Sequence, residues 1–228
     1  MVDVLAAEVK TVTETVIANN SELLNLSFSD FDLELKNYAK ENNVPIIFDE
    51  GLAFLETVIR LYKPKRILEI GTAIGYSAIR MNRVCSSLVT TIERNPKMYE
   101  EALKNVDKAG LEDSIEIIFK DALEAFDDVK HHKFDMIFID AAKAQYTKFF
   151  NLYTPLLNEG GIVVCDNMMF HGLVNDEASY EKQTRSVRGL IRKLAAFHSD
   201  LLNNKDYDTS IFNIGDGMSV SVKKTTNK

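Results

Sequence analysis

The sequence predicts an α/β protein built on one mostly parallel β-sheet with helices on both faces. Two observations support this prediction. Short apolar, β-prone runs, such as Arg66–Ile70 and Phe134–Ile139, alternate with segments of helical periodicity through most of the 228-residue chain. Near the C-terminus, two further runs flank Gly215-Asp216-Gly217, which is a hairpin signal. We therefore expect seven strands, of which the last pair adds an antiparallel edge.

The N-terminal part of the chain is predicted to be helical. Apolar side chains recur with helical spacing over residues 3–18, and Ser29 is a suitable N-cap for a second helix over 30–42. Pro45 interrupts the chain before a third helix, predicted over 50–62. The expected organisation is a helical extension followed by one larger domain, with bounds 1–44 and 45–228.

Beyond Pro64, strands and helices alternate, which indicates βαβ units. Pro96 suits a first helical turn, and Gly110 ends that helix. The predicted strands cover 66–70, 88–93, 114–119, 134–139, a run starting at Gly160-Gly161, 209–214 and 218–222. The predicted helices cover 77–84, 96–109, 122–126, 145–157 and 179–202.

Composition and charge narrow the class of protein. A hydrophobic content of 46% with 27% charged residues is ordinary for a soluble globular domain. No apolar run approaches the roughly 20 residues that span a bilayer, and the N-terminus lacks a basic leader, so we expect a cytoplasmic protein without membrane contact. The net charge of −7 arises within residues 1–50, which argues against a general nucleic-acid binder but allows a local basic patch elsewhere.

Oxygen-bearing side chains follow two of the predicted strands. Asp140 ends the run Phe138-Ile139, and Asp166-Asn167 ends the run Val163-Val164-Cys165. A buried strand that ends in a carboxylate is costly unless a cation meets it. If the two strands are neighbours, these three oxygen ligands suit a divalent cation such as Mg²⁺.

A cofactor turn is predicted after the first strand. Gly71 and Gly75 form a G-x-x-x-G pattern, Ser77 can offer a hydroxyl near a helix N-terminus, and Glu93 can accept both hydroxyls of a ribose. The spacing, with Glu69 two residues before the first glycine, favours S-adenosylmethionine over a nicotinamide, which would use G-x-G-x-x-G. A nicotinamide-dependent oxidoreductase and a non-catalytic binding module remain alternatives at this point.

With the cofactor turn and the metal motif in register, the chain resembles the cation-dependent class I S-adenosylmethionine O-methyltransferases, which include catechol and caffeoyl-CoA enzymes. The resemblance covers about residues 45–223. It implies a Rossmann-like, seven-stranded methyltransferase fold with an antiparallel C-terminal hairpin and an N-terminal helical extension. Within that family, Phe138–Tyr146, Asp166–Val174 and Gly215–Lys224 are similar to the bacterial tRNA 5-hydroxyuridine O-methyltransferases.

The resemblance also implies roles for individual residues, and a homodimer that uses the N-terminal helices. Lys143 would be the general base. Asp140, Asp166 and Asn167 would bind Mg²⁺ or Mn²⁺. The cofactor set would be Ile47, Glu69, Gly71, Gly75, Ser77, Glu93, Asp121, Ala122 and Asp140. Ala141-Ala142 replaces the aromatic pair of the catechol enzymes, and their acidic substrate-orienting residue has no counterpart that we can place, which puts a catechol acceptor in doubt.

The acceptor is left open between two classes. Both 5-hydroxyuridine and a catechol present two adjacent oxygens, so the metal motif alone does not choose between them. The predicted helix over 179–202 carries basic residues that share one face, and a tRNA, contacted at its anticodon region, would supply the matching anion. These basic residues are Lys182, Arg185, Arg188 and Arg192. We expect a tRNA acceptor giving 5-methoxyuridine; a solvated helix face with a small phenol or acyl-CoA acceptor is the alternative.

Two aromatic side chains near these motifs also have two interpretations. Tyr146, like Phe170, either stacks on a base or belongs to the core, whereas His171 is expected to touch the acceptor rather than to be a fourth metal ligand.

Overall fold

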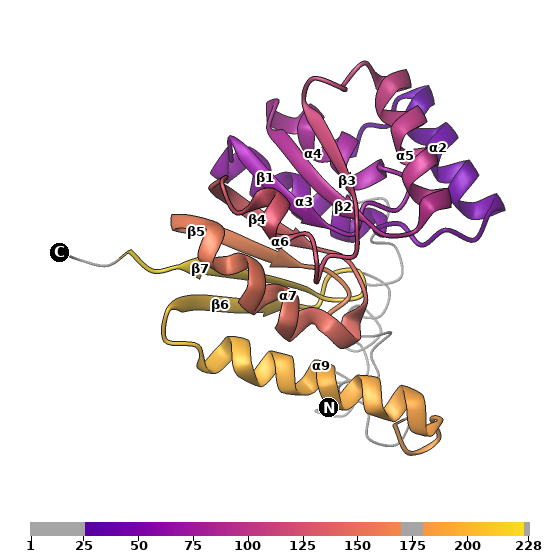
Figure 1. The fold of residues 1–228 in the computed structure, drawn as a ribbon. Helices are drawn as coiled ribbons and strands as arrows, with labels where there is room; N and C mark the ends of the chain where they lie inside the picture. The colour runs from indigo at the N-terminus through magenta and orange to yellow at the C-terminus, as the bar shows by residue number, and fades with distance from the viewer. Residues whose placement is uncertain (1–25, 170–179, 226–228) are drawn as a thin grey trace, which may run out of the picture.

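The computed structural model describes residues 26–169 and 180–225 and contains one seven-stranded sheet (Figure 1). The strand order is β3-β2-β1-β4-β5-β7-β6. Strands β1 to β5 pair in parallel, and β7 pairs antiparallel with both β5 and β6. The strands are β1 Arg66–Ile70, β2 Leu88–Glu93, β3 Ile115–Phe119, β4 Phe134–Ile139, β5 Leu157–Cys165, β6 Tyr207–Phe212 and β7 Met218–Lys223. The predicted α/β fold with a C-terminal antiparallel hairpin is confirmed.

Helices cover both faces of this sheet (Figure 1). The α-helices within the described residues are α2 Asp30–Glu41, α3 Asp49–Tyr62, α4 Tyr76–Cys85, α5 Pro96–Ala109, α6 Phe126–Val129, α7 Tyr146–Tyr153 and α9 Arg185–Asn203. Two 3₁₀ turns are η2 Lys143–Gln145 and η3 Thr154–Leu156. No helix in the described part of the chain is both long and apolar enough to cross a membrane.

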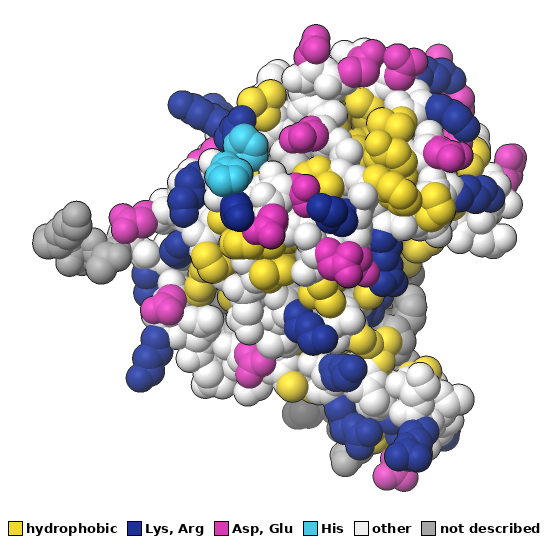
Figure 2. All heavy atoms as spheres, viewed as in Figure 1, with side chains coloured by type: hydrophobic (Ala, Val, Ile, Leu, Met, Phe, Trp, Pro, Cys, Tyr) yellow, Lys and Arg dark blue, Asp and Glu magenta, His cyan; other side chains and the backbone are white. Residues whose placement is uncertain are grey.

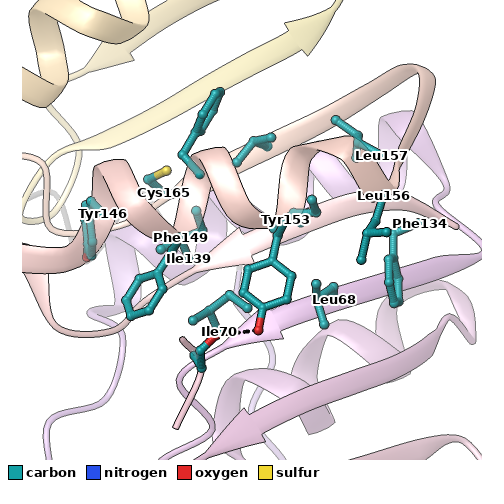
Figure 3. Close-up of a cluster of buried hydrophobic side chains, with 14 of the residues drawn as sticks. Leu68, Ile70, Phe134, Ile139, Tyr146, Phe149, Tyr153, Leu156, Leu157 and Cys165 are labelled. Carbon is teal, nitrogen blue, oxygen red and sulfur yellow. Dashed lines mark hydrogen bonds between the residues drawn. The ribbon is translucent and has the colours of Figure 1, made fainter. Parts of the chain in front are cut away.

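Successive side chains of β4 point to opposite faces of the sheet, and the core accordingly has two layers. Met136 and Phe138 pack into one cluster with α2 to α5, whereas Ile137 and Ile139 pack into the other with α6, α7 and α9. In the second cluster, the aromatic side chains of α7 lie over β1 and β4 (Figure 3). Because both faces of β4 are buried, this strand can offer polar side chains to a ligand mainly where it ends.

A buried ion cluster fixes α2 against the sheet domain. Asp32 on α2 accepts from Ser29 in a capping box and pairs with Arg80 and Arg83 on α4. Burial acts to raise the pKa of Asp32, but the Ser29 hydrogen bonds and the two arginines hold it below its ordinary value. Arg80 also binds Glu56 on α3. These contacts hold α2 beside the carboxyl ends of the strands.

Three predicted element bounds are wrong. The short helix expected at 122–126 is instead α6, at Phe126–Val129. The helix expected over 145–157 gives way at Thr154 to a 3₁₀ turn that contains Pro155, because proline lacks the N–H that would continue the helix. Strand β5 then begins at Leu157 rather than at Gly160.

A fourth correction concerns the basic helix, predicted over 179–202. Helix α9 begins at Arg185, because the Thr184 hydroxyl caps it by accepting from the Val187 N–H at 3.3 Å. Lys182 therefore precedes the helix and does not share a helical face with the arginines. The helix predicted over 3–18, Phe170 and His171 lie outside the described residues.

Candidate active site

A large cavity lies beyond the carboxyl ends of β1, β2 and β4, where α/β sheets bind ligands. Its volume is about 1000 Å³. Since small-molecule pockets run from about 300 to 1,000 Å³, the cavity has room for a cofactor and a second molecule together. Helix α2 and the segment before α3 form its outer wall. The predicted cofactor residues that line it are Ile47, Gly71, Ser77, Glu93, Asp121, Ala122 and Asp140.

Glu69 lies behind the cavity wall rather than on it. Its carboxylate is fully buried and accepts hydrogen bonds from the Ser77 hydroxyl at 2.5 Å and the Thr91 hydroxyl at 2.6 Å. Burial raises the pKa of Glu69 to about 8, although both hydroxyl donors act in the other direction. The structure thus places Glu69 as a support for Ser77, which does line the cavity.

The two predicted glycines serve backbone geometry. Gly71 has φ +105°, and a Cβ there would lie 2.1 Å from the carbonyl oxygen of Asp140. Gly71 therefore allows the loop after β1 to approach the end of β4. Gly75 has φ +84° and is the N-cap of α4, where it packs against Ala102 and does not line the cavity.

Glu93 is held rigidly at the cavity by backbone donors. Its carboxylate accepts from the N–H groups of Ala73 at 2.9 Å, Arg94 at 2.9 Å and Asn95 at 2.7 Å. Farther along the same wall, Asp121 accepts from the Leu123 N–H and from Arg94 at 3.0 Å. The Leu123 hydrogen bond, followed by Arg94, lowers the pKa of Asp121. Two carboxylates held by hydrogen bonds can thus face the hydroxyl groups of a nucleoside.

The predicted metal residues and the predicted base converge at one place. Strands β4 and β5 are neighbours, with Ile139 in register with Cys165, so Asp140 and Asp166 leave the sheet side by side. The Asn167 side-chain amide donates to Asp140 Oδ1 at 3.0 Å. Lys143 Nζ donates to Asn167 Oδ1 at 3.0 Å.

Asp140, which is half-buried, and Asp166, which is buried, lie close together, so their carboxylates lose hydration and repel each other. Both effects make the charged forms of these side chains unfavourable. Burial raises the pKa of Asp140, and Lys143 opposes that shift. Burial raises the pKa of Asp166 as well, and the charges of Asp140 and Asp216 raise it further. A cation bound between the two carboxylates would relieve both effects.

The donor set fits a hard divalent cation. Across residues 26–169 and 180–225, no three His, Cys, Asp or Glu side chains come together as a metal cluster. The set here is instead two carboxylates and one amide, all oxygen ligands of the kind that Mg²⁺ and Mn²⁺ take. Asn167 has φ +59°, so its backbone is turned into the left-handed region at the point where its side chain joins the two aspartates.

Asp216 is a further acid at this site that the sequence did not reveal. It is buried in the turn between β6 and β7, with Oδ2 4.0 Å from Lys143 Nζ. Its Gly-Asp-Gly context indicated only a hairpin. The strand order would have revealed Asp216: β7 pairs with β5, and this pairing brings the first residues of β7 next to Cys165. The turn also binds the loop that follows β5 and carries Asn167, since the Met169 N–H donates to the Asp216 carbonyl at 2.7 Å.

Tyr146 belongs to the core. Its side chain is 1% exposed, and its hydroxyl donates to the backbone carbonyl of Asp166 at 3.0 Å. The stacking interpretation of this residue is therefore wrong.

The arginines of α9 lie outside the cavity. Arg185 and Arg192 are exposed and Arg188 is half-buried, while Ile191 and Leu194 face the core. Figure 2 shows Lys and Arg side chains gathered over the N-terminal part of α9. The helix packs against η2, which carries Lys143, so this basic face adjoins the site without lining it.

Comparison with known proteins shows that this chain is similar to O-methyltransferases. The family model described as O-methyltransferase matches residues 27–224. A catechol O-methyltransferase from Niastella koreensis is 34% identical over 181 residues, which cover 75% of this chain and 79% of that protein. A caffeoyl-CoA O-methyltransferase from Populus kitakamiensis is 31% identical over 193 residues, covering 81% and 80%.

Solved structures agree with this fold. The crystal structure of a Staphylococcus aureus protein, provisionally named a caffeoyl-CoA O-methyltransferase, has a TM-score of 0.82 at 38% identity and covers 93% of this chain and 99% of that one. The S-adenosylhomocysteine-bound methyltransferase PaMTH1 of Podospora anserina also has a TM-score of 0.82, with 24% identity and 93% and 96% coverage. At 24% identity, the similarity to PaMTH1 shows a shared fold alone.

Proposed function

The chain belongs to the O-methyltransferase family and is an S-adenosylmethionine-dependent enzyme of the catechol and caffeoyl-CoA type. On this basis, we propose that it methylates an acceptor that carries two adjacent oxygens, with a divalent cation bound. The observation that carries this proposal is the meeting of Asp140, Asn167 and Lys143 within hydrogen-bond distance beside Asp166. Family membership replaces the nicotinamide-dependent oxidoreductase interpretation.

The cofactor side of the cavity would hold S-adenosylmethionine along the strand ends. Glu93 would accept the ribose hydroxyls, Asp121 with Ala122 would contact the adenine edge, and Ser77 with Ile47 would contact the methionine end. When bound, S-adenosylmethionine would supply an electrophilic methyl group, whose bond to sulfur would break as its carbon bonds to the acceptor oxygen, leaving S-adenosylhomocysteine. The fixed hydrogen bonds of Glu93 mean that this part of the site is already organised for binding.

On the acceptor side, Asp140, Asp166 and Asn167 would hold the cation. A bound Mg²⁺ or Mn²⁺ would supply Lewis-acid polarisation of an acceptor oxygen. Lys143 is placed to take the proton of the attacking hydroxyl, and Asp216 lies near enough to orient that ammonium. Together these side chains would deliver an ionised oxygen toward the cofactor.

We propose a small ortho-dihydroxy aromatic compound, or its coenzyme A ester, as the acceptor. The relatives named for catechol and caffeoyl-CoA support this class, and each is matched over three quarters or more of its length. The test is transfer of a labelled methyl group from S-adenosylmethionine to 3,4-dihydroxybenzoate and to caffeoyl-CoA, with 4-hydroxybenzoate as the control that lacks the second oxygen. We expect transfer to the diols, none to the monophenol, and loss of transfer in EDTA. Equal transfer to 4-hydroxybenzoate, or undiminished transfer in EDTA, contradicts the proposal.

A second candidate acceptor is 5-hydroxyuridine in tRNA, and the basic part of α9 supports it. The exposed arginines there lie on the helix that packs against the turn carrying Lys143, and they would contact a phosphate backbone. The test is label transfer to tRNA that lacks its own methylation, comparing wild type with an Arg185→Glu, Arg192→Glu double variant. Lys193→Glu is the matched control, because Lys193 lies on the same helix but is offset around it.

An RNA methyltransferase should lose tRNA activity in the double variant and keep it in Lys193→Glu. Label in small phenols but none in tRNA excludes this candidate. The homodimer implied by the family resemblance stays a prediction, which sedimentation velocity of the full chain would check.

A further inference from the structure

Tyr146 connects the two turns that make up the acceptor side of the site. It is the first residue of α7 and directly follows η2, the turn that begins with Lys143. Its N–H donates to the Lys143 carbonyl, which closes that turn. Its hydroxyl donates to the carbonyl of Asp166, at the end of β5. Figure 3 shows Tyr146 at this end of α7, near Cys165.

The carbonyl that Tyr146 binds belongs to a peptide group that needs support. It lies between Asp166 and Asn167, and Asn167 has a φ of +59°, which a non-glycine residue adopts only at a cost. On its far side, the loop is held by the β6–β7 turn, through Met168 N–H to the Gly217 carbonyl at 2.9 Å. Tyr146 holds the near side. These two attachments flank Asn167, whose side-chain amide contacts Asp140 and Lys143.

The Tyr146 ring is itself fixed. It is buried at 1% exposure and contacts Phe197 of α9 edge-on, with centroids 5.7 Å apart. A ring that is fixed by packing places its hydroxyl with little freedom, which suits a residue whose task is to set the position of another group.

We infer that Tyr146 is a positioning residue that sets the placement of the metal-ligand pair Asp166-Asn167 relative to the base Lys143. The inference rests on the proposed function. Tyr146 touches neither acceptor nor cofactor and acts through the Asp166 carbonyl. Partners that orient metal ligands typically account for 10- to 100-fold in metal affinity or activity.

The test is Tyr146→Phe, which removes the hydroxyl and keeps the ring in its packed position. Tyr207→Phe is the matched control. Tyr207 is also buried, its hydroxyl bonds to Thr154, and its ring contacts Phe150 edge-on at 5.2 Å. The full chain is titrated calorimetrically with Mn²⁺ in the presence of S-adenosylhomocysteine. Thermal unfolding and, with 3,4-dihydroxybenzoate, kcat and both KM values are measured alongside, at a temperature where all three proteins are folded.

We expect Tyr146→Phe to bind Mn²⁺ about tenfold more weakly and to lose about tenfold in kcat, with the KM for S-adenosylmethionine unchanged. Tyr207→Phe should lose thermal stability only. If Tyr146→Phe binds Mn²⁺ with wild-type affinity, the inference about Tyr146 is wrong but the proposed function stands. The same holds if Tyr207→Phe loses as much Mn²⁺ affinity as Tyr146→Phe. A wild-type protein that binds no Mn²⁺ overturns the proposed cation site and this inference with it.

Discussion

The side-chain oxygen of Asn167 accepts a hydrogen bond of 3.0 Å from Nζ of Lys143. The same amide donates to Asp140, so one side chain touches both the proposed base and a proposed metal ligand. The residues come from turns after different strands and meet because β4 and β5 are neighbours. Base and ligands therefore form one connected group, and a change at one of them should be felt at the others.

Replacement of Lys143 by methionine should reduce kcat by about 10²- to 10⁴-fold, the usual contribution of a positioned general base. Affinity for S-adenosylhomocysteine should stay within a few-fold of wild type, because Glu93 and Asp121 are untouched. Steady-state kinetics and calorimetry check the two expectations. Lys148→Met, an exposed lysine five positions along, is the control and should leave both values unchanged. Near-normal turnover in Lys143→Met would remove the assigned base.

Replacement of Asp166 by asparagine should abolish cation-dependent turnover while making the metal-free protein more stable. Asp166 is 2% exposed, and burial together with the charges of Asp140 and Asp216 raises its pKa. At pH 8 the folded protein must hold this carboxylate ionised despite its raised pKa, a cost that the unfolded chain does not bear, so a neutral amide should raise the free energy of unfolding by roughly 1–3 kcal/mol. Urea unfolding in EDTA checks this gain. A variant less stable than wild type, or one still activated by Mg²⁺, contradicts the account.

Glu69→Gln should flatten the dependence of stability on pH. Burial raises the pKa of Glu69 to about 8, so the folded protein holds a proton there that the unfolded chain has released above its ordinary value near 4.5. Wild-type stability should therefore fall as pH rises from about 4.5 to 8, by up to about 1.4 kcal/mol per pH unit from this group. Chemical unfolding at several pH values, in EDTA, would show a shallower slope for the variant. Parallel slopes for the two proteins would mean that Glu69 is ionised throughout.

Glu93→Gln should weaken cofactor binding. Three backbone N–H groups point at the Glu93 carboxylate, and an amide NH₂ in its place would face donors instead of accepting from them. We expect at least about tenfold weaker binding of S-adenosylhomocysteine by calorimetry. Glu116→Gln, on the exposed side of β3, is the control that should bind normally. Equal affinities for the two variants would show that the ribose is held elsewhere.

The sequence predicts the sheet well because its signals are local. β4 has the predicted bounds, since Phe134–Ile139 is apolar except for Asp135 near its start, and Asp140 ends it. Asp140 and Asp166 could be paired in advance because parallel strands end at one edge of a sheet. The placement of Ser77 and Glu93 at the cavity follows from the same rule.

The sequence predicts contacts made across the fold less well. Lys182 was grouped with the arginines because helical spacing alone does not show that the Thr184 hydroxyl starts a new helix. Asp216 was missed because Gly-Asp-Gly predicts a turn but not its neighbours, which depend on β7 lying beside β5. Glu69 was assigned to the cavity, whereas Thr91 on β2 and Ser77 on α4 occupy both of its oxygens.

The position of β7 has a consequence for how the enzyme matures. Although β7 is the last strand of the chain, it lies inside the sheet, between β5 and β6, and its leading turn carries Asp216 and binds Met168 and Met169. On a translating ribosome, the N-terminal strands emerge first and can pair in order. The acceptor half of the site therefore cannot form until β7 has been translated, so a nascent or truncated chain that stops before β7 would keep the strand ends beside Glu93 and Asp121 while lacking Asp216.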